Sequence, residues 1–239
     1  MYKIGDIVET DKYGDILVFY TNGWKNIGVR FQRTGTERTT NSSDLRKGLV
    51  KDVMQPTMFS VGYLGKNWED SKSKSAPYKL WKAMLQRVFD KNTKNTSYVN
   101  VSVCSKFLNF SEFEKWVLSC EYYNEYWDLD KDLLSGSEKI YSESTCCFIP
   151  REINVAVAKK SKGKHLKGVR PSLGKFYASC RKGGVGKEYL GTFETELEAF
   201  QAYKEAKEDY IKSLANKWKD QIDPRVYDAL IRYEVEITD

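Results

Sequence analysis

The chain has 239 residues, a formal net charge of +6 and a single histidine, and this length accommodates two or three small domains. The single histidine, His165, lies in a predicted basic linker, where a Ser-His-Asp or Cys-His catalytic arrangement is not credible. Five cysteines without a Cys-x-x-Cys pair indicate neither a disulfide framework nor a thiolate zinc site. We find no secretory signal and no apolar run long enough to span a membrane. We therefore expect a cytoplasmic protein with no membrane partner.

Residues 1–60 are predicted to form an all-β domain. Short runs rich in Ile, Val, Phe and Tyr predict strands at residues 5–10, 15–20, 26–31 and 37–41, separated by turns that contain Gly. This number of short strands favours a small β-barrel of the Tudor or Src-homology kind. The domain is basic, and its pattern fits a DNA contact as well as it fits a structural or protein-docking role.

A polar linker at residues 61–75 precedes a mixed unit at residues 76–158. Proline is favoured in the first turn of a helix, so Pro150 marks a helix start. The expected elements of the unit are a helix at residues 78–89, strands near residues 140–141 and 146–149, and a helix at residues 151–159.

The last predicted domain, residues 166–239, begins with two strand patterns around a Gly-rich turn. Thr195 and Glu198 form a capping box that starts a long helix. A three-stranded sheet packed on this helix is expected. The whole chain is thus predicted to be a multidomain α+β protein.

Side chains alternate between the two faces of a strand, and here the two faces differ in chemistry. Phe176, Ala178 and Cys180 form an apolar side that should pack on the helix. The opposite side should meet phosphates and base edges and consists of Lys175, Tyr177, Ser179, Arg181, Lys187 and Tyr189. Thr192 departs from this alternation and is expected near a strand end.

The positive charge is concentrated around the same sheet. Residues 159–187 contain ten Lys or Arg and no Asp or Glu. Such a block is typical of a surface that binds phosphates, although by itself it fits a solvated linker equally well. The strand alternation beside it favours nucleic acid.

Residues 166–210 resemble the apetala/ethylene-response type of DNA-binding domain, in which the sheet enters the major groove. The matching segments are Gly168-Val169-Arg170, Gly174-Lys175-Phe176, Arg181, Tyr189-Leu190-Gly191-Thr192-Phe193 and the helix from Glu198 to Tyr203. The resemblance implies DNA contacts by Lys167, Gly168, Arg170, Lys175, Ser179, Arg181, Lys187, Tyr189 and Thr192. Ser172 and Leu173 stand where the family often has Arg and Trp, so the resemblance implies no base preference.

Arg170 and Arg181 are the best candidates for reading bases, because Arg is the usual bidentate partner of guanine in the major groove. The alternative for Arg181 is an ion pair with a helix carboxylate such as Glu198, which would make it a structural residue.

A second resemblance, to the HNH module of phage-type homing endonucleases, lies in the middle unit. It rests on Leu129-Asp130-Lys131-Asp132, Ile140-Tyr141-Ser142, Ile149-Pro150 and Glu152-Ile153-Asn154. The resemblance implies a ββα unit around one metal ion, with Asp130 and Asn154 as ligands. Lys131 stands where the module has the histidine that activates water, and an ordinary Lys, with a pKa of about 10.4, is a poor base.

We therefore predict a degenerate HNH centre. If it were active, Asp130, Lys131 and Asn154 would be the catalytic candidates, with Mg²⁺ held by carboxylates such as Asp128, Asp132 and Glu143. The alternative is a solvated acidic turn in which Asp130 and Asn154 are structural hydrogen-bonding groups.

The order of the three units resembles a group of bacteriophage proteins related to homing endonucleases. The resemblance implies a protein of phage or mobile-element type that binds duplex DNA in the bacterial cytoplasm, as a regulator or blocker, without a cofactor or a small-molecule substrate. One alternative is an active metal-dependent nicking or homing endonuclease with a non-standard site. Another is a host-takeover protein whose N-terminal barrel binds a bacterial enzyme.

Overall fold

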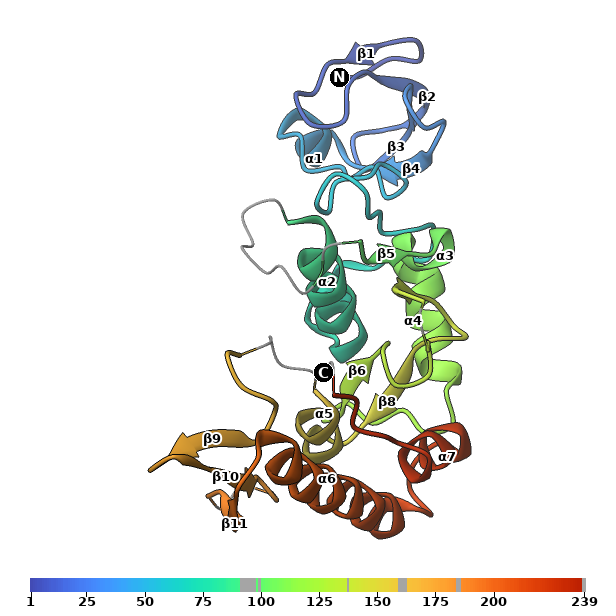
Figure 1. Cartoon of the computed structure of the whole chain (residues 1–239). Coiled ribbons are helices and arrows are strands. Elements are labelled where there is room, and N and C mark those ends of the chain that lie inside the picture. Colours follow the sequence, from blue (N-terminus) through green and yellow to red (C-terminus); the bar gives the residue numbers. More distant parts are fainter. Residues whose placement is uncertain (91–97, 99, 137, 159–162, 184–185, 238–239) are drawn as a thin grey trace. The chain divides into compact units, whose positions relative to one another are not determined.

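The computed structural model describes residues 1–90, 98, 100–136, 138–158, 163–183 and 186–237 (Figure 1). The chain divides into two compact units, Met1–Val117 and Leu118–Asp239. This division falls inside the predicted middle unit, and the three predicted domain boundaries stay predictions. No helix in the described ranges has the length and apolar character needed to cross a membrane.

The first unit begins with an antiparallel sheet. Its strands are β1 (Ile7–Val8), β2 (Ile16–Asn22), β3 (Asn26–Phe31) and β4 (Glu37–Thr40), paired in sequence order. All four predicted strands are present; β3 has the predicted bounds, and the other three differ from theirs by a few residues. Val18 and Val29 face each other across β2 and β3 and are fully buried. Leu45 of the short helix α1 (Ser42–Arg46) packs into the same core.

The predicted closed barrel is wrong, because this sheet is open. Each strand pairs only with its neighbour in sequence, and no pairing in the described part of the chain joins β4 back to β1. Closure requires strands long enough to tilt and stagger around an axis, whereas β1 has two residues. Leu45 and Val50 bury the apolar side of the sheet instead.

The remainder of this unit is mainly helical around an aromatic core. Its elements are η1 (Asp70–Lys74), α2 (Ala76–Phe89), β5 (Ser102–Val103), α3 (Ser105–Leu108) and α4 (Phe110–Ser119), of which α4 extends two residues past the boundary at Val117. The predicted helix at residues 78–89 is confirmed as α2. Trp81 is fully buried, and its indole N–H donates to the carbonyl of Phe107 at 2.7 Å.

The second unit has two hydrophobic cores along one long helix. Its elements are β6 (Asp128–Asp130), β7 (Ile140–Tyr141), β8 (Cys147–Ile149), α5 (Arg151–Val157), β9 (Val169–Ser172), β10 (Lys175–Cys180), β11 (Glu188–Phe193), α6 (Glu196–Trp218) and α7 (Pro224–Ile231). β6 pairs with β8, and α5 follows directly. Ile153 of α5 and Val226 of α7 pack with Ile211 of α6.

The predicted sheet on a helix is confirmed at the other half of α6. Strands β9, β10 and β11 form an antiparallel sheet in the order β11-β10-β9 (Figure 1). Ala178 and Cys180 pack against Ala199 and Phe200 of α6, as the alternation predicted. The capping box is also present and joins Thr195 to Glu198. The chain is thus an α+β protein with an open N-terminal sheet, a mixed middle and a C-terminal sheet on a long helix.

Candidate nucleic-acid interface

The side of the β9–β11 sheet that faces away from α6 carries the cationic and aromatic residues. Tyr177 lies opposite Arg170 on one side and Thr192 on the other. The rings of Tyr177 and Tyr189 stack with their centroids 6.0 Å apart. We call this surface the basic face, and it consists of Arg170, Lys175, Tyr177, Ser179, Arg181, Lys187, Tyr189 and Thr192.

A β-bulge explains the place of Thr192, which strict alternation had left unexplained. The pairing of β10 with β11 shifts register between Ala178 and Ser179, and Leu190 is the extra residue on β11. Because Leu190 has no partner on β10, Tyr189 and Thr192 lie on the same face of the sheet although they are three residues apart. The hydroxyls of Tyr189 and Thr192 accordingly lie 2.7 Å apart.

The cations of the basic face differ in how they are paired. Lys175 bonds to Glu194. Arg170, Arg181 and Lys187 are exposed, and none of them pairs with a carboxylate in the ranges that the structure describes. An exposed cation without a carboxylate partner can bind a phosphate directly, whereas a paired cation must first break its ion pair.

Glu198, the proposed structural partner of Arg181, is engaged elsewhere. Its carboxylate accepts a hydrogen bond from the backbone N–H of Thr195 at 3.0 Å. The structure therefore gives Arg181 no fold-supporting ion pair among the described residues.

Three of the predicted contact residues are less accessible than the others. Ser179 is 7% exposed. Lys167 is half-buried. Gly168 has a φ of +79°, and a Cβ atom there would lie 2.1 Å from Cδ2 of Tyr203. Gly168 is thus required for close packing of the chain on α6, a role that the resemblance did not imply.

A groove with a volume of about 980 Å³ adjoins the basic face within the same unit. Arg170, Arg181 and Lys187 line it together with Arg151 of α5 and Lys207 of α6. Sequence reasoning missed Arg151 and Lys207, because the fold brings them beside the sheet from separate helices. Their only sequence signal is that both are basic.

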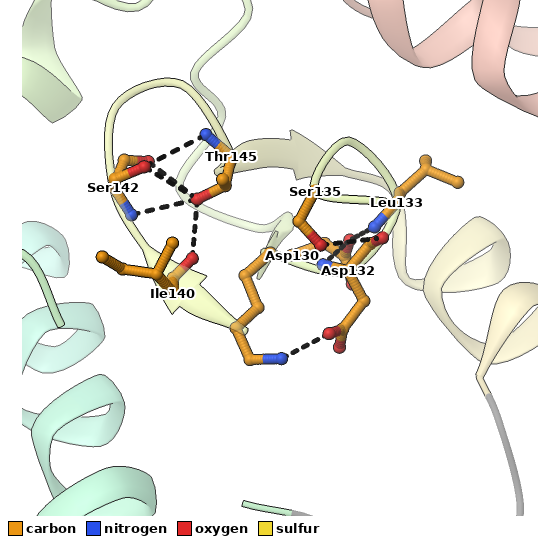
Figure 2. A network of polar contacts seen from close by, with 8 residues as sticks. Asp130, Asp132, Leu133, Ser135, Ile140, Ser142 and Thr145 are labelled. Atoms are coloured by element: carbon orange, nitrogen blue, oxygen red, sulfur yellow. Dashed lines mark hydrogen bonds and ion pairs between the residues drawn. The ribbon is translucent and has the colours of Figure 1, made fainter. Parts of the chain in front are cut away.

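The HNH candidates lie in another part of the unit. Asp130 is 9% exposed, and its Oδ1 accepts hydrogen bonds from the backbone N–H groups of Asp132 at 3.0 Å and Leu133 at 2.8 Å. Figure 2 shows this turn, with a separate hydroxyl network between Ser142 and Thr145 nearby. Burial raises the pKa of the Asp130 carboxyl, while the two N–H donors act in the opposite direction. These contacts fix a tight turn after β6.

The other two candidates also have structural partners. Lys131 is 5% exposed, bonds to Asp132 and lies 5.7 Å from the ring centroid of Tyr141. The amide of Asn154 donates to Oδ2 of Asp128 at 2.8 Å. Asn154 is therefore engaged by Asp128 rather than held ready beside Asp130.

The donor set does not fit the metal ion that an HNH module requires. Within the described ranges, no three His, Cys, Asp or Glu side chains gather so that they could hold a metal ion. Oδ1 of Asp130 is already engaged by two backbone donors, and a catalytic carboxylate would need to be open to its metal and water. We derive no catalytic step through this centre.

Two substitutions of Asp130 should behave differently in unfolding experiments. Asp130→Ala removes the acceptor of two part-buried hydrogen bonds from backbone N–H groups and should lower the free energy of unfolding by about 1–3 kcal/mol. Asp130→Asn keeps the acceptor oxygen. The raised folded-state pKa favours folding below about pH 4, and this contribution is lost as the pH rises through that pKa. The free energy of unfolding of Asp130→Asn, relative to that of the wild type, should therefore be higher at neutral pH than at about pH 4.

Urea unfolding at both pH values measures these effects. Because Asp130 is nearly buried, folded variants should bind duplex DNA as the wild type does. Equal stability of all three proteins at both pH values would contradict the structural role of Asp130.

Comparison of the chain with protein-family models, curated proteins and solved structures finds no match.

Proposed function

We propose that the second unit binds duplex DNA through the basic face. The observation that carries this proposal is a group of three exposed cations, Arg170, Arg181 and Lys187, around the stacked pair Tyr177 and Tyr189. None of the three has a carboxylate partner among the described residues. Neutralised phosphates release counterions, which supplies affinity for any sequence. Base edges in the major groove supply the specificity.

The shape of the sheet supports the same partner. A β-ribbon fits the major groove of B-DNA, which is about 12 Å wide. The helix α6 backs the sheet from the other side, so the strands are held on a rigid support while the basic face stays open. The resemblance to the apetala/ethylene-response type of domain points to the same mode of contact.

In this proposal the protein is a DNA-binding regulator or blocker of phage or mobile-element type. The contacts of Asp130, Lys131 and Asn154 within the fold argue against cleavage. Plasmid DNA incubated with Mg²⁺ or Mn²⁺ should stay uncut. Metal-dependent nicking that disappears in Asp130→Ala would replace this proposal by the endonuclease alternative.

Charge reversal on the basic face tests the proposal. Lys187→Glu replaces an attraction to phosphate by a repulsion and should weaken duplex binding about tenfold or more, since a hydrogen bond to a charged group is worth about 1.5–3 kcal/mol. Lys212→Glu makes the same change on an exposed part of α6, outside the basic face and the groove.

Fluorescence anisotropy with a labelled duplex at low salt measures both variants. Lys212→Glu should bind nearly as the wild type does. Equal losses in the two variants would mean that only net charge matters, and that the basic face is not the contact surface.

A further inference from the structure

The groove beside the basic face has the charge of an anion-binding site. Among the described residues, six cationic side chains line it: Arg151, Lys167, Arg170, Arg181, Lys187 and Lys207. Glu152 is the one carboxylate of the described wall, and it forms an ion pair with Lys217 at 2.6 Å. The cations thus outnumber the carboxylates in the described wall of the groove, which favours an anionic occupant.

Arg151 sets the groove apart from the basic face. It is the first residue of α5 and is exposed. No carboxylate among the described residues pairs with it. The positive charge in the wall of this groove therefore comes from α5 as well as from the sheet.

The size of the groove restricts its occupant. A volume of about 980 Å³ is that of a site for a drug-sized molecule or a few nucleotides. A duplex, whose major groove alone is about 12 Å wide, is too large to enter. Six cations from four segments also exceed what one phosphate group needs, and they suit a short row of phosphates.

The wall composition agrees with a single strand. Tyr203, Tyr210 and Tyr233 line the groove along with the cations. Grooves that hold single-stranded nucleic acid combine cations that follow the backbone with aromatic side chains. The shared cations Arg170, Arg181 and Lys187 make the groove continuous with the basic face.

We propose that this groove binds a short single-stranded segment of nucleic acid that continues from the duplex held on the basic face. This proposal rests on the proposed function, because the duplex delivers the strand to the groove. The protein would then prefer a junction between duplex and single strand to a blunt duplex.

The test compares a blunt duplex with the same duplex carrying a short oligothymidine overhang at either end. The full-length wild type should bind one of the two overhang duplexes at least severalfold more tightly than the blunt duplex. Each phosphate contact in the groove should steepen the salt dependence by about 0.7.

Arg151→Glu removes this gain if the proposal is right. A carboxylate at the first position of a helix interacts favourably with the helix dipole, so the variant should fold. Its affinity for the blunt duplex should fall far less than its gain from the overhang, because Arg151 lies outside the basic face. Lys212→Glu is the matched control and should keep the full gain.

The outcomes separate the two proposals. A blunt duplex that binds without any gain from the overhang, or a gain that survives in Arg151→Glu, overturns the groove proposal and leaves the basic face intact. Binding of free oligothymidine that requires Arg151, without duplex binding, overturns the proposed function and the junction with it, and leaves only single-strand binding in the groove. Absence of binding to every probe overturns both.

Discussion

Arg181→Ala should weaken binding to the preferred duplex by about 5- to 150-fold, equivalent to about 1–3 kcal/mol for a bidentate contact to guanine. Discrimination against other bases should fall at the same position. The reason is the position of Arg181 on the basic face, exposed and with no carboxylate partner in the described ranges. Its thermal stability should change little, because no fold-supporting ion pair is lost.

Arg181→Lys is the control that separates charge from geometry. Lysine keeps the positive charge but cannot form the planar fork that matches guanine. This variant should keep the affinity for unrelated duplexes and lose the preference for one site. A variant that melts early but discriminates normally when folded would show that Arg181 supports the fold.

Gly168→Ala should lower the free energy of unfolding by about 2–5 kcal/mol, which combines the cost of a left-handed backbone with that of overpacking. The added Cβ atom would overlap the ring of Tyr203 at 2.1 Å from Cδ2, and the φ of +79° is itself unfavourable for Ala. Such a loss would show that Gly168 serves the packing of the sheet on α6 rather than the DNA contact alone.

Gly174→Ala is the matched comparison. Gly174 has nearly the same φ, +78°, but no atom lies within 4 Å of the added Cβ position. Only the backbone cost should remain, about 1–2 kcal/mol. Urea unfolding of the two variants measures the difference, and equal losses would contradict the packing role of Gly168.

Local signals in the sequence were sufficient for most elements. Runs rich in Ile, Val, Phe and Tyr identified β2 and β3, alternation identified the two faces of β10, and the capping box at Thr195 marked the start of α6. These patterns involve only residues close together in the sequence, so they can be recognised without knowledge of the tertiary structure. The facing of Ala178 and Cys180 toward the helix follows from the same alternation.

Long-range features could not be predicted in the same way. Closure of the first sheet depends on how far β1 extends, and its two residues are too few. The bulge at Leu190 is a property of the pairing between two strands rather than of either strand. A lysine is seldom buried, so the position of Lys131 against Tyr141 could not be expected from residue type.

The candidate site was predicted in part. The positions of the cations along the strands predict that they lie on the basic face, but they do not predict which cations form ion pairs. Lys175 bonds to Glu194, whereas Lys187 has no carboxylate partner among the described residues. The contribution of Arg151 to the groove depends on the packing of α5 beside α6, which connects residues far apart in the chain.

Duplex binding as a function of salt concentration tests the proposed basic face most directly. The logarithm of the affinity should fall linearly with the logarithm of the salt concentration. Each neutralised phosphate contributes a slope of about −0.9. Arg170, Arg181 and Lys187, which have no carboxylate partner in the described ranges, therefore predict a slope of about −2.7 or steeper. No duplex binding at low salt, or binding that does not change with salt, would contradict the proposal that this face holds DNA.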